Sequence, residues 1–494
     1  MTRPRAAVVL LALAAVVVLV GLGVTAGRDG EPAGPGGRGE RPAAAPAQSQ
    51  EPSPDAAPAA RGSPDDPPFA TAVSPDGRYL VDQRGEPFLV RGDSPWSLLT
   101  DLTPDEQRHY LQTRAGQGFN AVLTALLGAV ANGAPSDDGA TVDGLHPFVD
   151  GDVTRLDDAY WDRVVATAET ARRLGLTLFL YPVDGWSVGK AFSPGGPDDC
   201  RAYGRAVAER FAGLPNVVWV MGGDYFPQTD DPAAGSDVDR CMDAALGGIR
   251  DAGDRRPFSV QLGYDVSRST DNPFWAPRVD WVFAYSYYPT YRAVLDARAT
   301  APARPVVFGE GNYEGENNQA ETAPTTPETL RRQVLWAMTS GAAGDFFGTD
   351  DWELLPGWQD RLGSPGVRAV TVARDVLAGL RWWELVPDGG PATVDGGRAL
   401  VESGRGRPVL DDAPGDVLDD DYVTAAATPD GAQAAVYVPT ARTVRLDLGL
   451  LRPGVVATWV DPSSGARHAA GSGPDFTTPG RNADGASDWL LVLR

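Results

Sequence analysis

Cysteine and histidine are scarce in this chain of 494 residues, which contains two cysteines and three histidines. Structural zinc sites take about four Cys and His ligands, so a Cys-rich zinc site is excluded. None of the three histidines follows a predicted strand, where a Ser-His-Asp triad or a metal cluster would place one. No Gly-x-Ser-x-Gly elbow or Walker-type loop occurs either. The sequence therefore predicts no metal site and no organic cofactor.

Lysine is nearly absent, since Lys190 is the only one in the chain. Asp and Glu number 66 against 43 Lys and Arg, which gives a net charge of −23. Proteins that bind nucleic acids rely on clustered cations to neutralise phosphates. A nucleic-acid partner is therefore not expected, while the oligomeric state stays open.

Charge is also missing from residues 6–24, an apolar stretch preceded by Arg3 and Arg5. Small residues at 24–26 suit cleavage by a signal peptidase, but roughly 19 apolar residues can also span a bilayer. Residues 1–26 are therefore a signal peptide or an uncleaved N-terminal membrane anchor. In both cases we expect an exported protein, secreted or attached to the cytoplasmic membrane. Residues 27–68, rich in Pro, Ala and Gly, predict a disordered linker.

The two cysteines, Cys200 and Cys241, form an even pair in a chain that we expect to be exported. Oxidising compartments favour a disulfide between such residues. The alternative is two buried thiols on neighbouring helices, because a free cysteine packs as a small hydrophobic residue.

From residue 69 to 388, short apolar runs alternate with amphipathic stretches, a pattern typical of a parallel sheet covered by helices. Thr103 followed by Pro104 predicts a helix start, and 157–174 and 326–340 predict two further helices. Eight runs predict strands: 87–91, 119–124, 177–181, 217–221, 258–262, 281–285, 306–308 and 342–347. Eight such units predict a (β/α)8 barrel, also called a TIM barrel.

The apolar period changes to two after residue 388. Predicted strands at 434–438, 444–448, 455–459 and 489–493 are separated by Gly, Pro and Asp. This pattern is typical of an antiparallel β-sandwich. Residues 389–494 therefore predict a small accessory domain.

Two of the predicted barrel strands end in a carboxylate. Val306-Val307-Phe308-Gly309 runs into Glu310, and the strand at 217–221 runs through two glycines into Asp224. Catalytic residues of such barrels lie at the carboxyl ends of the strands. Two carboxylates from separate strands can hydrolyse a glycosidic bond, one giving a proton and the other attacking or activating water. The sequence therefore predicts a glycoside hydrolase.

Several motifs resemble one family. Gly92-Asp93-Ser94-Pro95-Trp96 resembles the Gly-Asp-Thr-x-Trp motif of the apiosidase-like glycoside hydrolases, family 140. Residues 114–120 resemble the helix-to-strand junction of that family, and 341–348 its eighth strand. Residues 437–440 and 459–462 are similar to the β-sandwich, labelled collagen-binding, that follows this barrel. The resemblance covers about residues 79–494.

The resemblance implies an acid/base after the fourth strand, where Asp224 lies, and a nucleophile after the seventh, where Glu310 lies. It also implies an apiosyl or another furanosyl linkage, although Ser94 and Asp345 depart from the family pattern. A carboxyl separation of about 5 Å would retain the anomeric configuration, and about 7–9 Å would invert it. The structural alternative is that each carboxylate caps or pairs locally at its strand end.

Acids and aromatic rings that follow barrel strands are candidates for binding sugar hydroxyls and ring faces. We predict seven such residues: Asp93, Trp96, Asp184, Trp186, Tyr225, Tyr285 and Asp345. Core packing or an exposed loop position is the alternative for each of them. Tyr285 could also donate to Glu310. Glu314 and Glu316 are rivals of Glu310 for its role.

We therefore expect an exported glycoside hydrolase that acts on plant or microbial cell-wall polysaccharide. The alternative is a catalytically silent surface protein that binds glycan or matrix. An amide in place of either acid distinguishes the two, because only an enzyme has turnover to lose.

Overall fold

The structure is a computed structural model that describes residues 62–128, 139–185, 196–227, 229–264, 266–316, 324–389, 397–408 and 417–494. The apolar N-terminal stretch and most of the predicted linker lie outside these ranges. Within them, no helix is long and apolar enough to cross a membrane.

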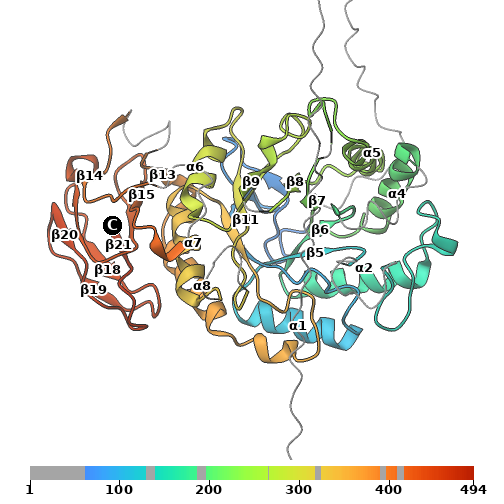
Figure 1. The fold of residues 1–494 in the computed structure, drawn as a ribbon, viewed down its shortest axis with the longest axis horizontal. Helices are drawn as coiled ribbons and strands as arrows, with labels where there is room; N and C mark the ends of the chain where they lie inside the picture. Colours follow the sequence, from blue (N-terminus) through green and yellow to red (C-terminus); the bar gives the residue numbers. More distant parts are fainter. Residues whose placement is uncertain are drawn as a thin grey trace, which may run out of the picture. The chain divides into compact units, whose positions relative to one another are not determined.

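Eight parallel strands form a barrel with helices outside it (Figure 1). The strands are β4 (Val90–Asp93), β5 (Ala121–Ala125), β6 (Thr177–Tyr181), β7 (Val217–Tyr225), β8 (Phe258–Leu262), β10 (Val282–Ser286), β11 (Val306–Glu310) and β12 (Gly344–Phe347). A ninth strand, β9 (Val266–Arg268), pairs antiparallel with β10. The predicted TIM barrel is confirmed.

The first barrel strand differs from its prediction. Pro87–Phe88 forms β3, which pairs with β2 (Leu80–Val81) and through it with β1 (Ala72–Val73) in a separate antiparallel sheet. The barrel strand β4 begins three residues later, at Val90. A single apolar run therefore serves two sheets, which periodicity alone does not separate.

Hydroxyl groups complete the barrel between β8 and β10, which are neighbours without a backbone ladder between them. Ser269 donates to the carbonyl of Val260 at 2.7 Å and accepts from the amide of Phe283 at 2.8 Å. Ser259 donates to the carbonyl of Trp281 at 2.6 Å. These hydroxyls satisfy buried backbone groups that would otherwise lose their partners.

Barrel strands alternate between two cores. Val218 and Val220 pack inside the barrel, while Val217 and Trp219 pack against the helix layer. Because both faces of the strand are buried, it reads as a continuous apolar run.

The helices begin and end where the sequence signals them. Thr103 caps α1 (Pro104–Gly116) in a capping box with Glu106, Asp157 caps α2 (Asp158–Arg173), and Thr326 caps α7 (Pro327–Thr339). The remaining barrel helices are α4 (Gly196–Arg210), α5 (Asp237–Asp251), α6 (Thr290–Ala299) and α8 (Pro365–Ala378).

The C-terminal region is a β-sandwich, coloured orange to red in Figure 1. One sheet has the order β13-β15-β16-β21-β18-β19 and the other β14-β17-β20. The strands are β13 (Val386–Pro387), β14 (Val401–Ser403), β15 (Thr424–Ala427), β16 (Ala434–Val438), β17 (Thr443–Leu446), β18 (Ala457–Val460), β19 (Arg467–Ala469), β20 (Asp475–Thr477) and β21 (Trp489–Leu493). The predicted antiparallel sandwich is confirmed.

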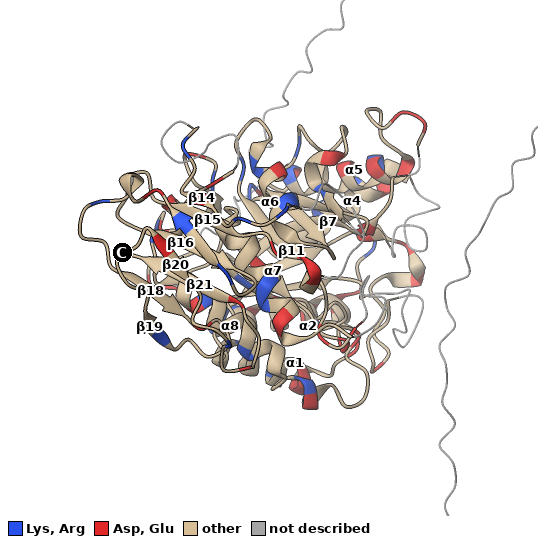
Figure 2. Ribbon diagram, turned by 60° about the vertical axis from the view of Figure 1, so that its left-hand side comes forward, with Lys and Arg blue, Asp and Glu red and all other residues tan. Residues whose placement is uncertain are grey.

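A buried ion pair joins the sandwich to the barrel. Arg331 of α7, a helix with basic positions in Figure 2, donates twice to Asp488 at 2.9 Å. Both side chains are almost fully buried, and Asn482 also donates to Asp488 at 2.7 Å. Satisfying both charges inside the contact fixes the sandwich against α7.

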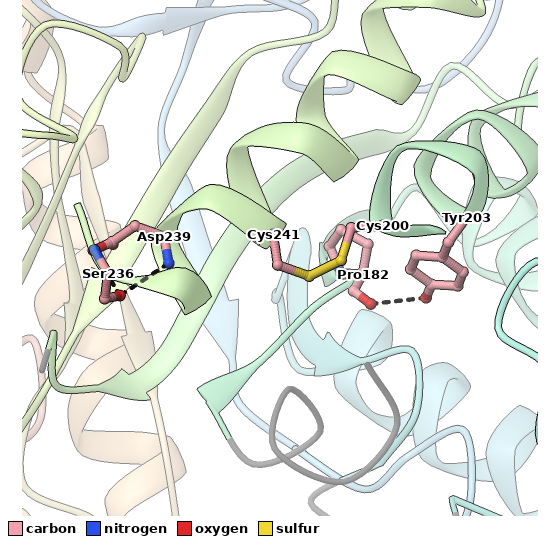
Figure 3. Close-up of a disulfide and its surroundings, with 6 residues drawn as sticks. All are labelled: Pro182, Cys200, Tyr203, Ser236, Asp239 and Cys241. Atoms are coloured by element: carbon pink, nitrogen blue, oxygen red, sulfur yellow. Dashed lines mark hydrogen bonds between the residues drawn. A yellow bond between two sulfur atoms is a disulfide. The ribbon is translucent and has the colours of Figure 1, made fainter. Parts of the chain in front are cut away.

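Cys200 of α4 and Cys241 of α5 form the predicted disulfide (Figure 3). The two helices pack so closely that a Cβ on Gly204 would lie 2.0 Å from the carbonyl oxygen of Ala245, so glycine is needed at this position. Beside the disulfide, Tyr203 donates to the carbonyl of Pro182 at 2.7 Å (Figure 3).

Removing this disulfide should lower stability through the unfolded chain. The sequence separation of 41 residues corresponds to about 3–4 kcal/mol of loop-closure entropy at 25 °C. We expect Cys200→Ser/Cys241→Ser to lose about this much free energy of unfolding in denaturant titrations. A reductant should destabilise the wild type and leave the double variant unchanged, and equal sensitivity of the two would contradict the assignment.

Candidate active site

Asp224 and Glu310 meet at the carboxyl ends of β7 and β11. The side-chain amide of Gln261, on β8, donates to Glu310 Oε2 at 2.6 Å and lies 3.3 Å from Asp224 Oδ1. Because both oxygens contact one nitrogen, they are within about 6 Å of each other, close to the separation of a retaining pair. The two predicted acids therefore share one small space.

A sharp turn directs Asp224 toward Gln261. Gly222, Gly223 and Asp224 all have positive φ, at 95°, 78° and 50°. A Cβ on Gly222 would lie 2.0 Å from the carbonyl oxygen of Gln261, so only glycine fits there. The pairing of β7 with β8 is correspondingly irregular between Gly222 and Tyr225. The Gly-Gly-Asp sequence thus sets the position of the acid.

Gln261 is held in one orientation. Tyr181, at the end of β6, donates its hydroxyl to Gln261 Oε1, which leaves the amide nitrogen to face the two carboxylates. Trp96 stacks on Tyr181 with ring centroids 5.1 Å apart and planes at 9°. The amide therefore acts as a fixed donor between two acceptors.

Tyrosines surround Glu310. Tyr285, at the end of β10, shares a hydrogen bond of 2.6 Å with the hydroxyl of Tyr287. Tyr313 accepts a hydrogen bond of 2.8 Å from the indole nitrogen of Trp96. Hydrogen bonds from Tyr285, Tyr313 and Gln261 to Glu310 favour its ionised form.

Burial opposes ionisation of both acids. Burial, with a smaller contribution from the charge of Glu316, raises the pKa of Asp224 to about 6 against the opposing effect of hydrogen bonding with Tyr285 and Gln261. Burial also raises the pKa of Glu310 well above its usual range, and the charge of Asp224 adds to this effect. Because each charge disfavours the other, the pair holds one proton over a range of pH.

Comparison with known proteins shows the family of the barrel. Residues 74–384 match the family model described as "Apiosidase-like, catalytic domain". The chain belongs to the apiosidase-like family. Residues 412–494 match a second model, "Putative collagen-binding domain of a collagenase". No curated protein matches the chain.

Solved structures share the fold. One is a glycoside hydrolase of family 5 from Bacteroides vulgatus, with 21% identity, 86% of this chain and 93% of that chain covered, and a TM-score of 0.71. Another, described only as a glycoside hydrolase, has 21% identity, coverages of 86% and 96%, and the same TM-score of 0.71. At this identity the likeness concerns the fold. Together with the family match, it identifies the barrel as a glycoside hydrolase-like catalytic domain.

Two acids of the apiosidase-like barrel were predicted to bind substrate and do not face the site. Asp93 pairs with Arg114 of α1 at 2.9 Å and accepts from Tyr110 at 2.5 Å, while Asp345 pairs twice with Arg374 of α8, at 3.0 and 2.7 Å. Strand alternation explains the error, because residues with odd numbers on β4 and β12 face the helices. Both acids instead hold the helix layer to the barrel.

Tyr225 is a further correction. Its hydroxyl shares a hydrogen bond of 2.7 Å with Ser236, the N-cap residue of α5, and its ring packs in the outer core. The ring therefore faces the helix layer and not the carboxylates.

The other predicted substrate residues have different outcomes. Asp184 is buried, and its backbone forms an isolated parallel β-bridge with Gly222, beside the Gly-Gly-Asp turn. Its role in substrate binding stays a prediction. Trp186 lies outside the described residues. Trp96 and Tyr285 reach the site, where Trp96 donates to Tyr313 and Tyr285 shares a hydrogen bond with Tyr287.

Glu314 and Glu316, the two other acids considered for the role of Glu310, have different hydrogen-bond partners. Glu314 accepts from the amide of Gly366 at 2.7 Å and from Ser364 at 2.5 Å, so it binds the first turn of α8. Glu316 accepts from the indole of Trp352 at 2.7 Å and is half-buried near Asp224, whose pKa its charge raises. Glu316 therefore tunes the site without reaching the shared amide.

Four participants were not predicted as site residues: Gln261, Tyr181, Tyr287 and Tyr313. Gln261 is one of two polar residues in the fully buried strand Phe-Ser-Val-Gln-Leu and is the one nearer its carboxyl end. That placement is the signal that could have found it, because a buried amide needs partners.

The turn before Asp224 gives a direct test. Gly222→Ala should reduce kcat/KM by about a hundredfold or more, because the added Cβ must displace Gln261 or Asp224 by about 1 Å. Gly85→Ala is a matched control, since Gly85 also has positive φ, at 82°, but has no neighbour within 4 Å of its Cβ position. Equal activity of the two variants would contradict the close packing at Gly222.

Proposed function

We propose that this chain hydrolyses O-glycosidic bonds by a retaining mechanism, with Asp224 as acid/base and Glu310 as nucleophile. The observation that carries the proposal is the Gln261 amide nitrogen, which lies 2.6 Å from one carboxylate and 3.3 Å from the other. Contact with one shared amide favours the shorter carboxyl separation of a retaining enzyme, about 5–5.5 Å, over the roughly 6.5–9.5 Å of an inverting one.

The hydrogen bonds support these two roles. The shorter contact of the Gln261 amide, 2.6 Å, is to Glu310, and the longer one, 3.3 Å, is to Asp224. A hydrogen bond to the ionised form of a carboxyl group favours that form. We therefore place the charge on Glu310 and the shared proton on Asp224, with the short hydrogen bond from Gln261 opposing the burial that raises the pKa of Glu310. This distribution is the one that the first step requires.

In the first step Glu310 attacks the anomeric carbon, and the bond to the glycosidic oxygen breaks as Asp224 protonates that oxygen. The leaving alcohol departs and a glycosyl ester of Glu310 remains. In the second step Asp224, now ionised, takes a proton from water, and the resulting hydroxide attacks the same carbon and releases Glu310. No organic cofactor is required.

The substrate that we propose is cell-wall polysaccharide of plant or microbial origin with an apiosyl or another furanosyl linkage. The apiosidase-like match over residues 74–384 supports this choice. The apolar stretch at residues 6–24, which follows Arg3 and Arg5, supports export of the protein, either secreted or retained in the membrane. The alternative is a catalytically silent glycan-binding protein, and the next experiment distinguishes it from an enzyme.

Amide substitution separates catalysis from binding. Asp224→Asn should lower kcat/KM by about 10²–10⁴-fold on wall polysaccharides, since general acid–base catalysis contributes that much. Glu310→Gln should abolish turnover while binding of oligosaccharide survives, and Glu314→Gln serves as a control that keeps its rate. If the wild type has no activity on a wide panel of aryl glycosides and polysaccharides, the protein is a binder.

The pH profile should have a limb set by Asp224. As pH rises through about 6, the pKa of Asp224, the acid loses its proton and kcat/KM should fall. Because the charge of Glu316 raises that pKa, Glu316→Gln should move the limb to lower pH. Glu314→Gln is the matched control and should leave it in place. A limb that neither Asp224→Asn nor Glu316→Gln alters would contradict the assignment.

A further inference from the structure

Two aromatic rings stand exposed at the strand ends beside the carboxylates. Phe226 follows β7 and Tyr264 follows β8, with 47% and 46% of their surfaces exposed. Their centroids are 5.0 Å apart with planes at 84°. Among the described residues, the other exposed large hydrophobic side chains are aliphatic: Val142, Leu355 and Val456. In the part of the chain that the structure describes, the large aromatic side chains that stand exposed therefore lie at this one edge of the barrel.

Gly263 leaves the space in which the Phe226 ring packs. A Cβ on Gly263 would lie 2.2 Å from the Phe226 ring, so the ring occupies the space that a side chain at 263 would fill. A larger residue at 263 would displace the ring. The position of Phe226 is thus fixed by packing, even though half of its surface is open.

The ring lies on the same side of β8 as the Gln261 side chain. Gly263 follows Gln261 by two residues, so in an extended chain its side chain would point the same way as that of Gln261, toward the carboxylates. Two residues of extended chain rise by about 7 Å, roughly one sugar ring beyond the Gln261 amide. Phe226 also follows Asp224 by two residues along the chain, immediately after β7. The ring therefore borders the site on the side of the acid.

The geometry points to an aromatic platform, Phe226 with Tyr264, that binds the sugar released as the leaving group. This inference rests on the proposed function, since it takes Asp224 as the acid. The acid protonates the oxygen between the sugar being transferred and the leaving sugar, so the leaving sugar lies on the acid's side. Aromatic faces bury the C–H face of a sugar ring at little entropic cost.

Glycosyl fluorides test the platform, because fluoride leaves without occupying that position. We would measure kcat/KM for fluorides of the common wall sugars and for wall oligosaccharides that carry the same terminal sugar. Phe226→Ala should lower kcat/KM on the oligosaccharide about tenfold or more and change the fluoride rate less than about twofold. Phe226→Trp should restore the oligosaccharide rate, and Val456→Ala, at an exposed site in the sandwich, should change neither.

Two results would overturn the platform: an equal loss on both substrates, which means a structural ring, or no loss on the oligosaccharide. Failure of the proposed function looks different, since the wild type would then be inactive on every fluoride. In that case calorimetric titration with the wall oligosaccharides decides. Weaker binding by Phe226→Ala keeps the ring as a sugar contact, and unchanged binding overturns it.

Discussion

One amide shared by two buried carboxylates is the contact on which the site depends. Two unit charges about 6 Å apart repel by about 3 kcal/mol at an effective dielectric constant of ~20, so Asp224 and Glu310 do not readily ionise together. Gln261 reduces this cost by donating to both acids, and Tyr181 prevents it from turning its oxygen toward them. The result is a pair of carboxyl groups with one proton and one negative charge, which is the state from which hydrolysis begins.

The outer layer keeps this geometry in place. Asp93 and Asp345 attach the ends of β4 and β12 to α1 and α8 through buried ion pairs with Arg114 and Arg374. Trp96, from the same Gly-Asp-Ser-Pro-Trp motif as Asp93, faces the other way and positions the site tyrosines. The motif therefore supports the site indirectly: Asp93 binds the helix layer, and Trp96 contacts the tyrosines around the carboxylates.

Much of this could be predicted from the sequence. The bounds of β6, β8, β16 and β21 are as predicted, and so is the N-cap of α1, because strand periodicity and capping are local signals. The helices predicted at 157–174 and 326–340 are found as α2 and α7. The sequence also predicted that the two acids meet, from their places at the ends of two barrel strands, while their burial was not predicted.

The errors have a common cause. Position after a strand does not tell whether a side chain faces the cleft or the helices, so Asp93, Asp345 and Tyr225 were placed on the wrong face. Gln261 was missed because its role exists only across strands: it joins β8 to β7 and β11, which are distant in sequence. The irregular pairing that brings Asp224 to it depends on the carbonyl of a neighbouring strand. Such contacts require the assembled barrel.

Covalent trapping tests the central claim most directly. A 2-deoxy-2-fluoro glycosyl fluoride slows both steps but releases a good leaving group, so a retaining enzyme accumulates its glycosyl ester. Peptide mapping by mass spectrometry should place that ester on Glu310. A label on Glu316 or another residue, or hydrolysis that inverts configuration without any label, would contradict the account.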